Sequence, residues 1–211
     1  MNTKAMVAEF VGTFTLVFIG AGVVAQNGGL VAAALAHGLV LMAFVYAIGS
    51  ISGAHVNPAV TFGALLAGEM TATDAVAWWV AQILGGVAGA GALAYVLGGT
   101  ESNLGATQLA EGVSVSRGLV LEGILTFFLV TMVLNTAVAG RGGNGAGAAI
   151  GLTLAFAILM GGPLTGASLN PARTLGPAVL TGGLDQFWVY LVGTFAGAAV
   201  AAGLYKGVLA D

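Results

Sequence analysis

Six long apolar segments restrict this chain to folds that cross a lipid bilayer. Each is close to the roughly 20 residues that a helix needs to span the hydrocarbon core. We therefore expect an all-α membrane protein with six transmembrane helices. The segments comprise residues 5–26, 30–49, 74–97, 117–140, 145–161 and 186–206.

The composition agrees with a membrane protein and excludes several kinds of partner. Charged residues make up 6% of the chain, whereas a soluble domain carries about 25%. Cysteine is absent, which excludes disulfides and thiolate metal sites. The net charge is −3 and the basic residues form no cluster, so no nucleic-acid partner is expected.

Two further apolar runs, residues 57–67 and 170–180, are too short to cross a membrane. At ~1.5 Å per residue, eleven helical residues reach about half of the hydrocarbon thickness. Each run begins with Asn-Pro. Proline is tolerated in the first turn of a helix, and asparagine is a good cap. We therefore expect two half-helices, each entered by a re-entrant loop.

The two halves of the chain repeat each other. Glu9 precedes Asn57 by 48 positions, and Glu122 precedes Asn170 by the same 48 positions. Each half carries three spans and one half-helix. Because three is odd, the second half must enter the membrane from the opposite side, which makes the repeats inverted. The two half-helices then enter from opposite faces, and their starts are expected to meet near the midplane.

This repeat predicts one channel domain over residues 1–211, with inverted repeats at about 1–105 and 110–211. Its orientation follows from the basic residues, which favour the cytoplasmic side. With six spans, Lys4, Arg141 and Lys206 fall on one side. Both termini are therefore expected in the cytoplasm, and the longest connection, residues 98–116, is expected outside.

The asparagines of the short runs carry the chemistry. Irregular backbone at membrane depth is tolerated where it is buried or lines a water-filled cavity. At the midplane, the amides of Asn57 and Asn170 would both donate to one permeant molecule. Carbonyl groups of residues 50–56 and 162–169 would accept along its path. The positive ends of two half-helices oppose cations, including the hydrated proton. This arrangement suits a small neutral polar molecule.

The paired motifs Asn57-Pro58-Ala59 and Asn170-Pro171-Ala172, with six spans and one matching glutamate per half, resemble the aquaporin (major intrinsic protein) family. The resemblance covers nearly the whole chain. It implies a right-handed bundle that passes the cell membrane six times. It also implies a homotetramer in the lipid bilayer, in which each subunit has its own pore for water or small neutral solutes.

The resemblance also implies a selectivity filter. Arg173 matches the family's filter arginine, and His37, Ile158 and Ala167 match its other three positions. This set is similar to that of plant tonoplast intrinsic proteins, a pattern that goes with water plus ammonia. The alternatives are an arginine that reaches a membrane interface and a histidine that only packs between helices.

Three other ionisable residues have two interpretations each. His55, two residues before Asn57, either lines the pore or fixes the loop by hydrogen bonds. Glu9 and Glu122 are acids inside spans, which are functional candidates by default. A proton relay is one option. The equal spacing and the family resemblance favour a structural role, in which each glutamate binds the re-entrant loop of its own half.

Glycine and aromatic residues predict how the spans meet each other and the lipid. The pairs Gly85 and Gly89, and Gly193 and Gly197, are small-residue patterns that allow close helix approach. Aromatic side chains near span starts are expected to anchor the protein at the membrane interface. These are Trp78, Trp79, Trp188 and Tyr190.

Three transport functions fit the sequence, and an enzyme does not. The first is a passive channel for water and ammonia that excludes protons and ions. The second is a facilitator of glycerol or urea, which Leu191 favours, while Thr174 and Ala178 favour water. The third is a proton-coupled transporter. No nucleophile–base set or metal cluster is visible, so no enzyme, metal or cofactor is expected.

Overall fold

A computed structural model describes residues 2–210, and within them every regular element is a helix. Six helices are long and apolar enough to cross a membrane, which confirms the predicted all-α fold. Two shorter helices, α4 (Pro58–Ala67) and α8 (Pro171–Thr181), are the predicted half-helices. The spans are α1 (Thr3–Thr15) with a π-helical segment (Leu16–Ala21) and α2 (Gly22–Ala25), α3 (Leu30–Ser52), α5 (Ala72–Leu97), α6 (Val115–Val133) with a π-helical segment (Leu134–Val138), α7 (Ala146–Thr165), and α9 (Phe187–Leu204) with a π-helical segment (Tyr205–Leu209).

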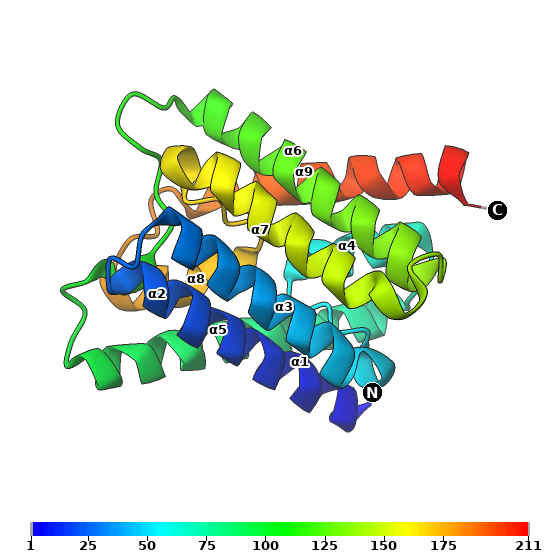
Figure 1. Ribbon diagram of the computed structural model, residues 1–211, viewed down its shortest axis with the longest axis horizontal. Coiled ribbons are helices and arrows are strands. Elements are labelled where there is room, and N and C mark those ends of the chain that lie inside the picture. The colour runs from blue at the N-terminus through cyan, green and yellow to red at the C-terminus, as the bar shows by residue number, and fades with distance from the viewer. Residues whose placement is uncertain (1, 211) are drawn as a thin grey trace.

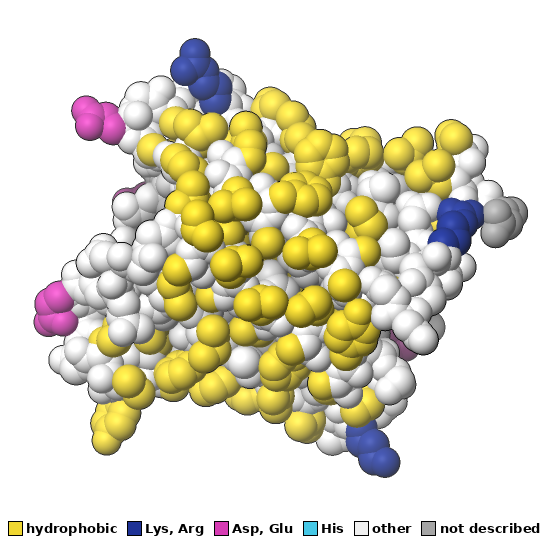
Figure 2. Space-filling view, in the orientation of Figure 1, with side chains coloured by type: hydrophobic (Ala, Val, Ile, Leu, Met, Phe, Trp, Pro, Cys, Tyr) yellow, Lys and Arg dark blue, Asp and Glu magenta, His cyan; other side chains and the backbone are white. Residues whose placement is uncertain are grey.

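The spans lie side by side along the long axis of the molecule (Figure 1). In Figure 2, apolar side chains cover the middle of the visible face, and charged side chains lie toward its two ends. An apolar belt between two charged rims is the surface that a bilayer requires. Both chain ends lie at the same end of the bundle in Figure 1, as an even number of spans demands.

The fifth span is longer than its apolar pattern indicates. The predicted segment stops at residue 161, but α7 continues to Thr165 through Pro163. Proline removes the backbone N–H that would bond the carbonyl four residues earlier, and the helix continues for only two residues beyond it. The helix ends at Gly166, whose φ of 79° is a left-handed cap. The sequence Gly161-Gly162-Pro163 therefore lies within the C-terminal end of the helix and does not terminate it.

Glycines lie where the spans cross, as the small-residue patterns predict. A Cβ atom on Gly89 of α5 would lie 2.6 Å from the carbonyl oxygen of Phe14 in α1. A Cβ atom on Gly193 of α9 would lie 2.9 Å from the carbonyl oxygen of Leu119 in α6. Real Cβ atoms do not approach carbonyl oxygens so closely. The backbones of these helix pairs thus touch, with no side chain between them.

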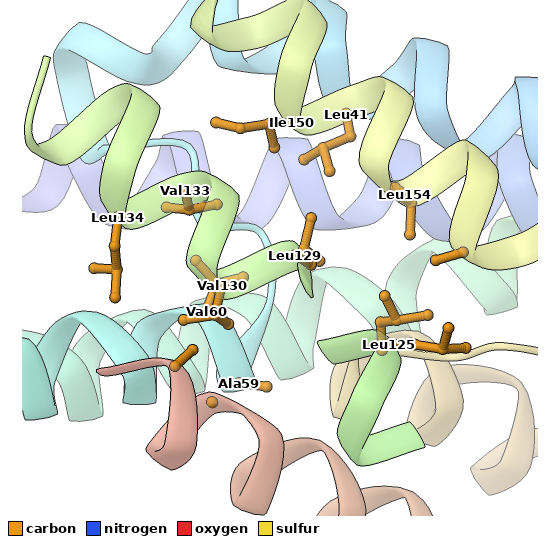
Figure 3. Packing of buried hydrophobic residues seen from close by; sticks show 14 of the residues in the cluster. Leu41, Ala59, Val60, Leu125, Leu129, Val130, Val133, Leu134, Ile150 and Leu154 are labelled. Carbon is orange, nitrogen blue, oxygen red and sulfur yellow. The ribbon is translucent and has the colours of Figure 1, made fainter. Parts of the chain in front are cut away.

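Leucine, isoleucine and valine side chains fill the centre of the bundle (Figure 3). They come from α3, α6 and α7, and from the half-helix α4, which packs under α6. This cluster packs against α4 and also includes residues of both re-entrant loops, namely Val56, Ala167 and Leu169. Its labelled members are Leu41, Ala59, Val60, Leu125, Leu129, Val130, Val133, Leu134, Ile150 and Leu154.

Candidate pore and selectivity filter

The loops before the two half-helices share an unusual backbone. Ala54 and Val56 have φ values of 50° and 43°, and their repeat equivalents Ala167 and Leu169 have 43° and 53°. A left-handed conformation is uncommon for any residue with a side chain and rarest for a β-branched one such as valine. It persists only where the surroundings enforce it, and such sites are often functional. The same strain at equivalent positions in both halves points to a shared role.

Glu9 holds the first loop through four hydrogen bonds. Its Oε1 accepts from Ser52 Oγ at 2.6 Å and from the backbone N–H of His55 at 2.9 Å. Its Oε2 accepts from the N–H of Val56 at 2.6 Å and from Gln82 Nε2 at 2.7 Å. The carboxylate is fully buried. All four of these partners are donors, which is the arrangement that an ionised carboxylate needs.

Glu122 holds the second loop with the same geometry but one bond fewer. Its Oε1 accepts from Thr165 Oγ1 at 2.7 Å and from the N–H of Ser168 at 3.0 Å, and its Oε2 accepts from the N–H of Leu169 at 2.9 Å. The repeat equivalent of Gln82 is Phe195, which offers no donor.

These hydrogen bonds determine which way the loop carbonyls face. Residues 2–210 contain no cis peptide, so each N–H and the C=O of the same peptide point in opposite directions. The N–H groups of residues 54–56 are taken by Ser52 Oγ and Glu9, which turns the preceding carbonyls away from the carboxylate. No hydrogen bond within residues 2–210 uses these carbonyls. They belong to Gly53, Ala54 and His55, and in the second loop to Gly166, Ala167 and Ser168.

Three of the four aromatic residues expected at the membrane interface bind the re-entrant regions instead. Trp78 is buried, and its indole N–H donates to the carbonyl of Ser52 at 3.0 Å. Tyr190 is buried, and its hydroxyl donates to the carbonyl of Thr165 at 2.7 Å. Ser52 and Thr165 are repeat equivalents. Trp79 donates to the carbonyl of Pro58. Trp188 is exposed, as an anchor should be, and Trp79 is partly exposed. The interface prediction was wrong for the two buried side chains, Trp78 and Tyr190.

The two asparagines meet at the centre of the bundle. Nδ2 of Asn57 donates to the carbonyl of Leu169 at 2.7 Å, and Nδ2 of Asn170 donates to the carbonyl of Val56 at 2.8 Å. Each Oδ1 accepts from the first turn of its own half-helix, at Ala59 and at Ala172. Because an amide nitrogen carries two hydrogens, each asparagine keeps one N–H beyond these bonds.

Three cavities lie in series through the molecule. We call the cavity beside residues 105–107 the outer one and the cavity beside residues 136–147 the inner one, as names only. The outer cavity has a volume of about 320 Å³, the central one about 20 Å³ and the inner one about 540 Å³. The outer and central cavities share His37 and Arg173 in their walls. The central and inner cavities share His55 and Val133, among others. Together they form a path whose narrowest part has room for on the order of one water molecule.

The central cavity is polar where the loops reach it and apolar where the spans reach it. Asn57, Asn170 and the backbone of residues 53–56 supply polar groups. Figure 3 shows the apolar contribution of α3, α6 and α7, and Leu16 of the first span adds to it. Leu41, Leu129, Val133, Ile150 and Leu154 all line this cavity.

The structure brings three of the four predicted filter residues together. His37, Ile158 and Arg173 line the outer cavity, and each is buried. Ala167 is also buried but is not among the lining side chains, although its neighbour Gly166 is. Its backbone N–H donates to Thr165 Oγ1 and is therefore not free to bind a molecule on the path.

Arg173 and His37 contact each other at the narrow point between the outer and central cavities. His37 Nδ1 lies 2.8 Å from the carbonyl of Ala33, and because a carbonyl can only accept, Nδ1 carries the proton. Nε2 then accepts from Arg173 Nε at 3.4 Å, so the imidazole is neutral. Arg173 Nη1 is buried without a hydrogen-bond partner in residues 2–210.

The longest connection, residues 98–116, folds over this same outer cavity. Gly105, Ala106 and Thr107 line it, and Thr107 Oγ1 lies 2.9 Å from Thr174 Oγ1 in α8. The sequence pattern gave no signal for Thr107, because nothing near it is repeated or periodic.

His55 combines the two interpretations that the sequence left open. Its Nδ1 lies 3.0 Å from Thr61 Oγ1, which fixes the ring against the half-helix α4. It also lines both the central and the inner cavity. No cluster of three metal-ligating side chains occurs in the described part of the chain.

Comparisons with known proteins agree with this geometry. The chain is similar to Aquaporin TIP1-2 of Zea mays, with 45% identity over 97% of this chain and 85% of the relative. It is similar to Aquaporin TIP2-1 of Arabidopsis thaliana, with 40% identity over 98% and 88%. The X-ray structure of the aquaglyceroporin from Plasmodium falciparum superposes with a TM-score of 0.90 at 25% identity, over 100% of this chain and 98% of that one.

The profile of the major intrinsic protein family matches residues 1–205. The chain therefore belongs to the major intrinsic protein family, the family of the aquaporins, whose members are passive membrane channels and not enzymes.

Proposed function

We propose that this channel conducts water, and ammonia by the same path, while it excludes protons and ions. The observation that carries the proposal is the central constriction. There, a cavity of about 20 Å³ is lined by Asn57, Asn170 and Arg173, and Nη1 of Arg173 has no hydrogen-bond partner within residues 2–210. A site with donors at its centre and carbonyl acceptors beside them fits a small neutral molecule that can both accept and donate.

Passage through this constriction follows from its hydrogen bonds. A water molecule at the centre accepts from the remaining N–H groups of Asn57 and Asn170, and it then turns its own hydrogens along the path. The loop carbonyls accept them on one side. The apolar side chains of α3, α6 and α7 offer no competing partner, so each molecule is held only briefly and moves in single file.

The same geometry opposes protons and cations. The starts of α4 and α8 meet at the centre, and each contributes the positive end of a helix dipole. Arg173 adds a full positive charge close by. A water whose oxygen accepts two amide hydrogens cannot accept a proton from its neighbour. We infer that the centre breaks any chain of proton transfer between waters.

The roles proposed for the other residues follow from their contacts. His37, Ile158, Ala167 and Arg173 form the filter, with Ala167 contributing through its backbone position beside Gly166. We assign Glu9 and Glu122 to loop support. A proton relay needs a carboxylate that exchanges its proton with the path, whereas both carboxylates accept hydrogen bonds from protein donors.

The assembly and its orientation are proposals of the same kind. We propose a homotetramer in the cell membrane, which is the assembly that the family resemblance implies, with a complete path in each chain. Both termini would lie in the cytoplasm, on the side where Lys4, Arg141 and Lys206 gather.

Stopped-flow light scattering on proteoliposomes tests the function. The wild type and His37→Phe would be compared for water efflux and for uptake of ammonia, urea and glycerol. Fast, non-saturating water flux with little glycerol uptake is expected. Ammonia uptake that His37→Phe abolishes, with water flux retained, supports the filter assignment. Water flux equal to that of empty liposomes contradicts the proposal.

A facilitator of larger neutral solutes is the second candidate. Ile158 faces the outer cavity with an apolar side chain, which leaves that wall of the filter without a hydrogen bond for water. The superposed Plasmodium falciparum protein is titled an aquaglyceroporin. Glycerol or urea uptake comparable to water flux in the same liposomes would favour this candidate.

A further inference from the structure

Gly20 lies directly against the ring of His37. It belongs to the π-helical segment Leu16–Ala21 of the first span. A Cβ atom on Gly20 would lie 2.5 Å from both Cδ2 and Nε2 of His37 and 2.7 Å from its Cγ. Such distances do not occur between real atoms, so the ring occupies the space that any other residue at position 20 would need for its side chain.

The backbone itself does not require glycine here. Gly20 lies inside a helical segment and has no positive φ, in contrast to Gly29 and Gly53 at helix ends. Alanine would be at least as favourable for the helix. The constraint at position 20 is therefore the space that the imidazole occupies.

The imidazole is held on its other sides. Nδ1 is bound to the carbonyl of Ala33 one turn earlier in α3, and Nε2 accepts from Arg173 Nε. The ring also lines both the central and the outer cavity. If the ring were pushed away from the first span, the space that remains open to it is the path between these cavities.

Gly20 belongs to a π-helical turn of the first span, beside the ring of His37. A π-helical turn holds one more residue than an α-helical turn, and such turns are frequent at functional sites. The segment also carries Leu16, which lines the central cavity. The same irregular stretch of the first span therefore contacts the path at Leu16 and provides the recess for His37 at Gly20.

We propose that Gly20 is a positioning residue that sets the aperture of the filter. By lacking a side chain, it lets His37 withdraw toward the first span, so that the imidazole accepts from Arg173 Nε at the wall of the path and does not fill the path itself. This inference rests on the proposed function, because it takes the constriction at His37 to be the step that limits passage.

The test is Gly20→Ala in proteoliposomes, measured for water and for the largest neutral solute that the wild type passes. Selectivity in such pores depends on diameter and on lining groups, so we expect water permeability to fall by about fivefold and that of the larger solute to fall more. Gly91→Ala is the matched control, because a Cβ atom at Gly91 meets nothing within 4 Å. It should match the wild type.

The double variant Gly20→Ala/His37→Ala tests whether the loss of flux in Gly20→Ala arises from contact with the His37 ring. With the ring removed, Gly20→Ala should no longer change the flux measured for His37→Ala alone, since the two effects are not additive when the residues touch. Size-exclusion chromatography checks that each protein is folded. If Gly20→Ala alone does not fold, recovery of folding and flux in the double variant still identifies the ring as the point of conflict.

Two results would overturn the inference. One is a folded Gly20→Ala with wild-type water flux and an unchanged ratio of solute to water permeability. The other is a double variant that loses flux or folding as severely as Gly20→Ala does. A wild type that does not conduct water is a different outcome, because it removes the proposed function itself.

Discussion

At the scale of single residues, Glu9 and Glu122 show why a charged group is buried twice in a membrane protein. Each satisfies two backbone N–H groups in a loop that has no secondary structure to satisfy them. An unsatisfied donor at membrane depth is costly. The spacing of 48 residues predicted which loop each carboxylate serves. It did not predict Gln82, which gives Glu9 a fourth donor that Glu122 lacks.

The two carboxylates can be compared by changing each to an uncharged isostere. Each carboxylate oxygen of Glu9 accepts two hydrogen bonds, so in Glu9→Gln the new amide group faces two donors in either orientation. Oε2 of Glu122 accepts only one hydrogen bond, so in Glu122→Gln the amide group can take that place and face a single donor. Each buried donor left unsatisfied costs about 1–3 kcal/mol. We expect both variants to be less stable than the wild type, and Glu9→Gln to be the less stable of the two.

Thermal unfolding of the purified protein in detergent measures this order. Glu111→Gln is the control, because Glu111 is exposed in the external connection, and it should unfold at the wild-type temperature. Equal stability of Glu9→Gln and the wild type would show that the carboxylate charge is not needed to hold the loop.

At the scale of elements, backbone contact between helices decides how the bundle closes. The α1–α5 and α6–α9 pairs touch at glycines, and α3 and α7 meet in the same way. A Cβ atom on Gly38 of α3 would lie 2.6 Å from the carbonyl oxygen of Gly151 in α7. Small residues allow such contacts in lipid, where the hydrophobic effect does not drive helices together.

A single side chain at one crossing should therefore separate its helices. Gly89→Val places a branched side chain against the carbonyl of Phe14 in the adjacent helix, where neither backbone can move without shifting the loop that Glu9 holds. Overpacking of this kind costs ~1–3 kcal/mol or more. We expect a large loss of folded protein after membrane extraction, measured by fluorescence-detected size exclusion. Gly91→Val, two residues away and facing open space, should be recovered like the wild type.

At the scale of the whole molecule, the fold is two inverted halves whose half-helices meet end to end. Each asparagine binds a carbonyl of the opposite loop, so neither half completes the central constriction alone. The predicted orientation of the molecule in its membrane depends on only four basic residues. Three basic residues lie on one side, and Arg117 lies at the start of α6 on the other.

The absence of cysteine makes this orientation directly testable. We expect Glu101→Cys, in the external connection, to react in intact cells with a maleimide that cannot cross membranes. Asn144→Cys, beside the inner cavity, should react only after the cells are permeabilised. Cells that express the unchanged chain, which has no cysteine, give the background. The reverse pattern would place both termini outside.

The sequence alone determined the membrane class, the six spans, the two half-helices and the inverted repeat. These follow from local properties, since segment length, apolar runs and Asn-Pro starts act within about 20 residues. The repeat also predicted that Asn57 and Asn170 approach each other, because an odd number of spans leaves no other arrangement.

Only the tertiary structure decided how the path is shaped. The contacts of Trp78 and Tyr190 with loop carbonyls, the place of Thr107 over the outer cavity and the recess at Gly20 all join residues far apart in the chain. No periodicity encodes such contacts, because they depend on how closely the helices pack. The dimensions of the constriction are set by that packing, and with them the molecules that can pass.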